Sequence, residues 1–237
     1  MAVDVKICGI MTPEHARAAV TAGADLIGLV FAPSRRRISV AQAREIASAA
    51  RDAAAERGSN VGLVGVFVND APEQINVIVA EVGLDWVQLS GHEDVATISA
   101  ISAPVVKAIR FDDHPSEAGW LAQSAESGRV DPLLIDANVT GSFGGAGVTG
   151  DWEQAAALAR RRVTWLAGGL TPDNITAALQ RVQPQAVDVS SGVETEGVKD
   201  VAKITAFIQN ARRVPLTAAA PDAHSATAHM LSMQEEQ

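Results

Sequence analysis

Residues 3–31 read VDVKICGIMTPEHARAAVTAGADLIGLVF, and this stretch predicts the unit from which the fold is built. Two apolar runs, Val5–Gly9 and Asp25–Phe31, are typical of buried strands. Between them, Thr12-Pro13 is typical of a helix N-cap with proline at the first helical position, and Gly23 is a typical helix stop. Two strands joined by a helix of this length predict a βαβ unit with parallel strands.

The same unit recurs along the 237 residues of the chain. Further helix signals are a capping box formed by Ser39 and Gln42 and a second Thr-Pro pair, Thr171-Pro172. Repetition on a chain of this length favours an α/β fold, a (β/α)8 TIM barrel, over the structural alternative of an open doubly wound sheet. The predicted strands are Val5–Gly9, Asp25–Phe31, Val61–Val68, Trp86–Ser90, Val105–Arg110, Leu133–Ala137, Val163–Gly168 and Ala186–Ser190.

We expect a single barrel domain over residues 1–214 and a flexible C-terminal tail over residues 215–237. The last helix is predicted over Val201–Arg213, and the sequence after it shows no clear periodicity. A docked extra helix in this tail is the alternative.

The composition argues against several classes of function. The chain has 19 Lys and Arg against 28 Asp and Glu and only 4% aromatic residues, whereas nucleic-acid-binding proteins present a basic surface and stacking aromatics. Apolar runs such as Leu26–Ala32 are too short to cross a bilayer. Cys8 is the only cysteine, so no intramolecular disulfide can form, and the N-terminus lacks the pattern of a secretory signal. We therefore expect a cytoplasmic protein with no nucleic-acid and no membrane partner.

Polar residues recur on one face of the predicted strands. Side chains alternate along a strand and the outer face of a barrel packs on helices, so these polar residues should point inward, most of them at the strand ends where barrel active sites form. Lys6 and Asp188 could also be an interior ion pair, and Cys8 a small core residue. In the fifth strand, alternation does not decide between Lys107 and Arg110. The inward set is Lys6, Cys8, Gln88, Ser90, Asp136, Asp188 and Ser190.

Glycine-rich stretches follow the last strands. Gly168-Gly169 ends the seventh strand and Ser190-Ser191-Gly192 ends the eighth, and glycine lets backbone N–H groups approach an anion closely. The loops after these two strands commonly hold phosphate in such barrels. A third run, Gly144–Gly147, follows the sixth strand. Arg35-Arg36-Arg37 follows the second strand and is either a carboxylate clamp or a solvated basic loop.

Together these motifs resemble the phosphoribosylanthranilate isomerase family of tryptophan biosynthesis. The strongest elements are Lys6-Ile7-Cys8-Gly9 and Asp188–Glu194, and matching segments run in family order over roughly residues 3–210. The resemblance implies an aldose–ketose isomerase, an intramolecular oxidoreductase. It would convert N-(5′-phosphoribosyl)anthranilate into 1-(2-carboxyphenylamino)-1-deoxyribulose 5-phosphate by an Amadori rearrangement, with no cofactor and no metal. The partner it implies is this small phosphoribosyl substrate, and the protein could be a monomer or a homodimer.

The resemblance also implies a role for each matching residue. Asp136 would be the general acid that opens the ribose ring, and Cys8, as a thiolate, would remove the proton from C2′. Arg36 would hold the anthranilate carboxylate, and Asp188 would lie beside the ribose. Because Asp136 must start protonated, we expect burial to raise its pKa. The phosphate would bind at Gly168, Gly169, Ser190, Ser191 and Gly192.

The chain departs from the family pattern at Ser90, where the family usually has His, and at Ala146 and Gly150 in the glycine loop. These changes affect the substrate pocket rather than the acid–base pair. One alternative function is the related isomerase of histidine biosynthesis, which Cys8 disfavours because two aspartates would be expected. The other is a non-catalytic barrel that binds a phosphoribosyl ligand, which the presence of both Cys8 and Asp136 disfavours.

Overall fold

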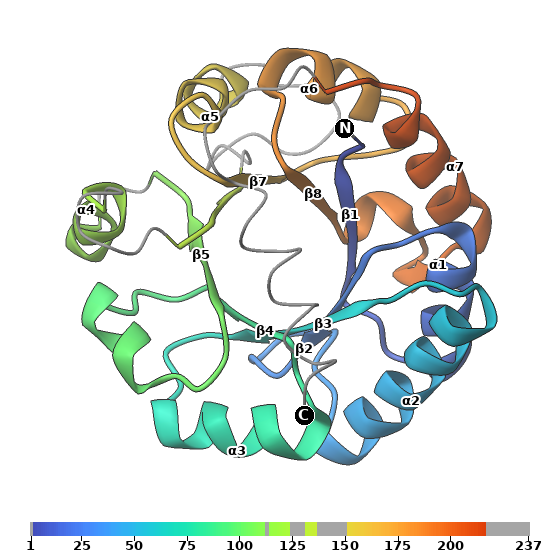
Figure 1. Ribbon diagram of the computed structural model, residues 1–237, viewed down its shortest axis with the longest axis horizontal. Helices are drawn as coiled ribbons and strands as arrows, with labels where there is room; N and C mark the ends of the chain where they lie inside the picture. The colour runs from blue at the N-terminus through green and yellow to red at the C-terminus, as the bar shows by residue number, and fades with distance from the viewer. Residues whose placement is uncertain (1, 112–113, 124–130, 137–150, 217–237) are drawn as a thin grey trace.

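The eight strands close into a barrel. The computed structural model describes residues 2–111, 114–123, 131–136 and 151–216 of the chain. Each strand pairs in parallel with the next, and β1 also pairs with β8, which confirms the (β/α)8 barrel and excludes the open sheet (Figure 1). The strands are β1 Asp4–Cys8, β2 Leu26–Val30, β3 Gly62–Phe67, β4 Trp86–Leu89, β5 Val105–Ile109, β6 Leu133–Asp136, β7 Thr164–Ala167 and β8 Ala186–Val189.

Helices surround the barrel (Figure 1). They are α1 Pro13–Ala22, α2 Val40–Glu56, α3 Pro72–Val82, α4 Pro115–Leu121, α5 Asp151–Ala159, α6 Ile175–Val182 and α7 Val201–Arg212. Between β4 and β5 a 3-10 helix, η1 (Val95–Ala100), takes the place of an α-helix. After β8 come a short 3-10 turn, η3 (Ser191–Val193), and a hairpin of β9 (Glu194–Thr195) and β10 (Val198–Lys199).

The predicted caps of the first two helices are confirmed. Thr12 Oγ1 accepts a hydrogen bond from the backbone N–H of His15 at 3.3 Å, and Ser39 and Gln42 form the reciprocal capping box. Gly23 ends α1 in the left-handed conformation, with φ of +107°, which a side chain would disfavour. These local signals therefore set where the first two helices begin and where α1 ends.

The expected start of α6 at Thr171-Pro172 is wrong, because the helix begins at Ile175. The backbone N–H of Thr171 donates to Asn174 Oδ1 at 2.8 Å, and the backbone N–H of Asn174 donates to Thr171 Oγ1 at 3.3 Å. This reciprocal pair closes a separate turn before the helix, as Ser, Thr and Asn side chains commonly do.

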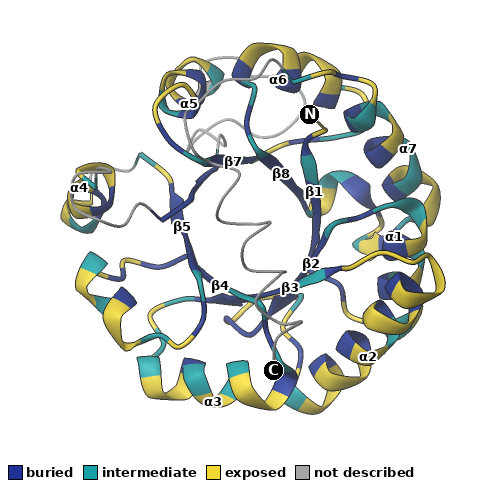
Figure 2. Cartoon of the chain, in the orientation of Figure 1, coloured by how far each residue is buried: buried dark blue, intermediate teal, exposed yellow. Residues whose placement is uncertain are grey.

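Apolar side chains fill both faces of the strands. Figure 2 shows the strands mostly buried and the helices exposed on their outer sides. One cluster packs between strands and helices and includes Ile7, Leu63 and Leu166, all fully buried. The barrel interior holds Leu26, Val64, Val106, Ala108, Leu134, Trp165, Ala167 and Ala186, and toward the carboxyl ends of the first strands Cys8, Val30, Ala32 and Val66. This alternation fixes which polar side chains point inward.

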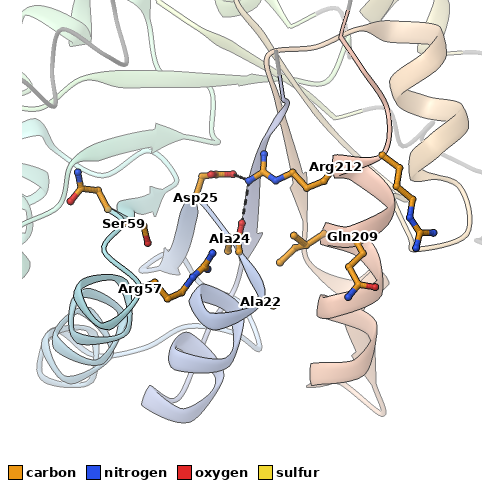
Figure 3. Close-up of a pocket in the computed structure, with 11 residues that line it drawn as sticks. Ala22, Ala24, Asp25, Arg57, Ser59, Gln209 and Arg212 are labelled. Carbon is orange, nitrogen blue, oxygen red and sulfur yellow. Dashed lines mark hydrogen bonds and ion pairs between the residues drawn. The ribbon is translucent and has the colours of Figure 1, made fainter.

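A cleft at the amino-terminal end of the barrel is lined in part by the last helix. Arg212 of α7 forms an ion pair with Asp25 (Figure 3). It also donates to the backbone carbonyls of Val3 and Gly23. The cleft has a volume of about 430 Å³, and the described residues that line it include none of the predicted site residues. Because barrel active sites lie at the opposite end, we interpret this cleft as structural.

Several sequence-based expectations fall outside the described residues. The glycine run Gly144–Gly147, with the departures Ala146 and Gly150, lies in 137–150, and most of the expected tail lies in 217–237. The barrel boundary at residue 214 therefore stays a prediction. None of the helices in the described ranges has the length and apolar character needed to cross a bilayer.

Candidate active site

The predicted catalytic pair lies at the carboxyl ends of two strands of the barrel. Cys8 is the last residue of β1 and Asp136 is the last residue of β6. Because all eight strands run parallel, both residues stand at the same end. Cys8 packs against interior residues, and Asp136 shares a face of β6 with Leu134, which packs inside the barrel. The thiol and the carboxyl group therefore both face the interior at one mouth.

The space around Cys8 depends on a glycine in the neighbouring strand. Cys8 is only 8% exposed, and a Cβ added at Gly28 would lie 2.7 Å from its Sγ. Burial raises the pKa of the Cys8 thiol, and the positive charges of Lys6 and Lys199 oppose this rise while Asp188 adds to it. Burial therefore favours the neutral thiol, and the nearby cations favour the thiolate.

A chain of polar side chains crosses the barrel below the mouth. Lys6 Nζ donates to Gln88 Oε1 at 2.7 Å and lies 3.1 Å from Asp188 Oδ1. Gln88 Nε2 in turn donates to Ser90 Oγ at 2.9 Å. All four residues are at most 9% exposed, and the contact between Lys6 on β1 and Gln88 on β4 joins two strands across the barrel. The prediction that these residues point inward is therefore confirmed.

The structure decides whether Lys107 or Arg110 of the fifth strand region points into the barrel. Val106 and Ala108 pack in the interior, so Lys107 lies on the outer face. Its Nζ donates to the carbonyl of Gly91 at 2.6 Å and forms an ion pair with Glu93 at 3.1 Å. Arg110 follows the strand on the inward face. Its guanidinium donates to the carbonyl of Ser90 at 2.5 Å, at the rim of the barrel.

Arg36, the predicted carboxylate clamp, is itself held by a carboxylate. Its Nε and Nη2 donate to the two oxygens of Glu194 at 2.7 and 2.9 Å. Glu194 also forms ion pairs with Arg35 at 2.6 Å and with Lys199 at 2.9 Å. Burial acts to raise its pKa, but the hydrogen bonds from Arg36 and Lys199 prevail and lower it to about 2. This bidentate pair fixes the plane of the Arg36 guanidinium.

Sequence reasoning did not assign Glu194 to the site. The available signal was its position, two residues after the glycine of the last strand's loop in a chain with three consecutive arginines. The side chain of Glu194 is 4% exposed, and an almost buried carboxylate needs partners of opposite charge. Gly9 is a further residue that was missed: it has φ of +74°, and a Cβ there would collide with the side chain of Arg36.

The two predicted phosphate loops contact each other. Gly168 and Gly169 adopt left-handed backbone conformations, with φ of +87° and +63°. A Cβ at Gly192 would overlap the carbonyl oxygen of Leu170, so the loop after β8 packs directly against the loop after β7. Asn174 Nδ2 donates to the carbonyl of Gly169 at 2.9 Å and steadies the first loop. The structure brings the predicted glycines together at the carboxyl ends of β7 and β8.

Ser190 of the last loop joins this loop to β1. Ser190 Oγ donates to the backbone carbonyl of Cys8 at 3.1 Å, and Lys199 Nζ donates to the carbonyl of Ser190 at 2.8 Å. Ser191 begins the short turn η3. Because the hydroxyl hydrogen of Ser190 is engaged with β1, the backbone N–H groups are the more available donors for an anion. Within the described ranges, no group of three or more His, Cys, Asp or Glu is arranged to hold a metal ion.

Comparisons with known proteins agree with this arrangement. The family model for N-(5′-phosphoribosyl)anthranilate isomerase matches residues 5–210. The isomerase of that name from Roseiflexus castenholzii is 56% identical over 210 residues, which are 88% of this chain and 97% of that protein. The crystal structure of the Thermotoga maritima phosphoribosylanthranilate isomerase is 40% identical, with a TM-score of 0.73 over 90% of this chain and 100% of that one. A phosphoribosylanthranilate isomerase in complex with reduced 1-(o-carboxyphenylamino)-1-deoxyribulose 5-phosphate is 38% identical, with a TM-score of 0.70 over the same shares of the two chains.

Proposed function

The chain belongs to the N-(5′-phosphoribosyl)anthranilate isomerase family, and from this premise we propose that Cys8 and Asp136 transfer the protons of its reaction. The reaction is the Amadori rearrangement of N-(5′-phosphoribosyl)anthranilate in tryptophan biosynthesis. One observation carries the residue assignment: the thiol and the carboxyl group end two parallel strands and face the interior at the same mouth.

Asp136 acts first, as the general acid. It gives its proton to the ring oxygen of the ribose while the bond between that oxygen and C1′ breaks. The lone pair of the anthranilate nitrogen then forms a double bond to C1′, which gives an open-chain iminium ion. An inward carboxyl group at the rim suits this step because it can start protonated and end as a carboxylate beside a cation.

Cys8 acts next, as the general base. Its thiolate removes the proton from C2′, and the electrons of that C–H bond form a double bond between C1′ and C2′ as the iminium nitrogen becomes neutral. The enolamine then takes a proton at C1′ and releases the proton of its C2′ hydroxyl, which gives the ketone. The positive nitrogen makes C2′ acidic, so a thiolate is a sufficient base. Every bond change is internal to the substrate, so the rearrangement needs no external oxidant or reductant.

The remaining predicted residues bind the two ends of the substrate. Arg36, oriented by Glu194, would receive the anthranilate carboxylate through the part of its guanidinium that Glu194 does not engage. Asp188, paired with Lys6, would lie beside the ribose. The phosphate would bind to backbone N–H groups of the two contacting loops, at Gly168, Gly169, Ser190, Ser191 and Gly192.

A fluorescence assay for consumption of phosphoribosylanthranilate tests the assignment. We expect Cys8→Ala and Asp136→Asn each to lower kcat by about 10²–10⁴-fold, the usual contribution of a positioned acid or base. Both variants should still bind the reduced product analogue, which separates loss of chemistry from loss of folding. If both variants turn over like the wild type, the residue assignment is wrong; if the wild type is inactive, the reaction itself is wrong.

The family match favours the tryptophan-pathway substrate over that of the related histidine-pathway isomerase. We also propose a cytoplasmic location, as expected for an enzyme of amino-acid biosynthesis. Its ligand is a small phosphoribosyl compound, and whether the chain is a monomer or a homodimer stays open.

A further inference from the structure

We propose that Lys6 is a positioning residue for the catalytic base: its ammonium group, held inside the barrel beneath Cys8, stabilises the thiolate. The proposal rests on the proposed role of Cys8 and adds a residue to it. Lys6 precedes Cys8 by two positions on β1, so the two side chains share the inward face. Lys6 stands one step deeper in the barrel than the thiol that it supports.

The partners of Lys6 fix the position of its charge. An ammonium group has three N–H donors. One donates to Gln88 Oε1 at 2.7 Å and a second faces Asp188 Oδ1 at 3.1 Å, from strands β4 and β8. The next inward side chain on the same strand is Cys8, and the charge of each group favours the ionised form of the other. The side chain of Lys6 is fully buried, so water does not screen this interaction.

A second buried lysine, Lys107, serves as a comparison because its contacts are those of a structural ion pair. Lys107 is 1% exposed, and its Nζ contacts the carbonyls of Leu89 and Gly91 as well as Glu93. All of these partners lie on β4 or in the loop that follows it. Lys6 is buried as completely, but it contacts Gln88 on β4 across the interior and Asp188 on the neighbouring β8, and the next inward side chain on its own strand is the proposed base.

Among the charged groups around Cys8, Lys6 favours the thiolate most strongly. Burial acts first and disfavours the thiolate, and Asp188 on β8 disfavours it too. Lys199 on β10 and Arg36 after β2 favour it less than Lys6 does, and both are paired with Glu194, as Lys6 is with Asp188. Asp136 stands across the mouth on β6. Without Lys6, the thiol would face burial and the Asp188 carboxylate with little opposition.

Because Cys8 is the only cysteine, its titration can be followed without any substrate. The rate of alkylation by iodoacetamide is measured as a function of pH. The midpoint of this profile reports the pKa of the Cys8 thiol, and its plateau at high pH reports how accessible the thiolate is. An opposite charge in contact shifts such a midpoint by about 1–3 pH units. In Lys6→Met we therefore expect a midpoint at least about one pH unit higher and, at pH 8, alkylation slowed by at least about 10-fold.

Two further variants separate a charge effect from a folding effect. Lys107→Met breaks the other buried ion pair and should leave the Cys8 midpoint unchanged. Lys6→Met combined with Asp188→Asn removes both charges of the interior pair, and we expect its midpoint to lie between those of Lys6→Met and the wild type. If the folded Lys6 variants titrate like the wild type, Lys6 has only a structural role and the proposal is wrong.

Kinetics distinguish this proposal from the assignment of Cys8. The acid limb of the pH profile of kcat/KM should move upward in Lys6→Met by the same amount as the alkylation midpoint. A shifted midpoint with an unmoved acid limb would support the action of Lys6 on Cys8 but overturn Cys8 as the base.

Discussion

Replacing Glu194 with glutamine removes a carboxylate that three cations share. Arg35, Arg36 and Lys199 all contact it within 3 Å, and its side chain is 4% exposed. These contacts lower its pKa from an ordinary 4.5 to about 2. At 1.36 kcal/mol per pH unit, this corresponds to about 3 kcal/mol of folding stability at pH 7. We therefore expect Glu194→Gln to lower the free energy of unfolding at pH 7 by about that amount.

The pH dependence of this loss provides the sharper test. A carboxyl group whose pKa is lower in the folded state stabilises the protein above its unfolded pKa, and this contribution disappears as the pH falls toward the folded pKa. For Glu194 the window runs from 4.5 down to about 2. The stability difference between wild type and Glu194→Gln should therefore shrink by about 2 kcal/mol between pH 7 and pH 3.

Urea unfolding of both proteins at the two pH values measures this difference, in which carboxyl groups common to both proteins cancel. Glu56→Gln is the matched control, because Glu56 pairs with Arg17 on the surface with 66% of its side chain exposed. A surface pair of this kind contributes about 0–1 kcal/mol. If the loss in Glu194→Gln is equally large at pH 3 and pH 7, the ionised carboxylate is not its source and the reasoning fails.

Two glycine substitutions test the geometry of the site. Gly28→Ala places a methyl group 2.7 Å from Cys8 Sγ and so displaces the thiol. We expect kcat in the fluorescence assay to fall by about 10²-fold. An unchanged kcat would show that the thiol does not need this space. Gly192→Ala drives the loop after β8 away from Leu170. We expect a raised KM and weaker inhibition by inorganic phosphate, with kcat little changed. A normal KM would argue against phosphate binding in this loop.

The barrel could be predicted because its signals are local. β-branched runs marked the strands, caps marked both ends of α1 and the start of α2, and alternation placed Lys6, Gln88 and Asp188 inside. The start of α6 could not be predicted, because Thr171 and Asn174 form hydrogen bonds with each other that compete with the helix. The sequence is compatible with a helix that begins at Pro172 and with a separate turn closed by Thr171 and Asn174. Only the relative energy of these two arrangements decides between them.

The site was predicted residue by residue, but its internal contacts were not. Arg36 and Glu194 are 158 residues apart, and their pairing depends on how the loops after β2 and β8 meet in space. The need for Gly28 beside Cys8 follows from the register of two strands, which alternation does not specify. The raised pKa expected for Asp136 stays a prediction.

The pairing of β1 with β8 has a consequence for biogenesis. Cys8 and Ser190, which donates to its carbonyl, are 182 residues apart, so a nascent chain holds Cys8 for most of its synthesis without the strand that completes its surroundings. Contacts of such long sequence separation form slowly. Chains that have formed most of their helices but not the pairing of β1 with β8 would be inactive. Turnover would begin only when the barrel is closed.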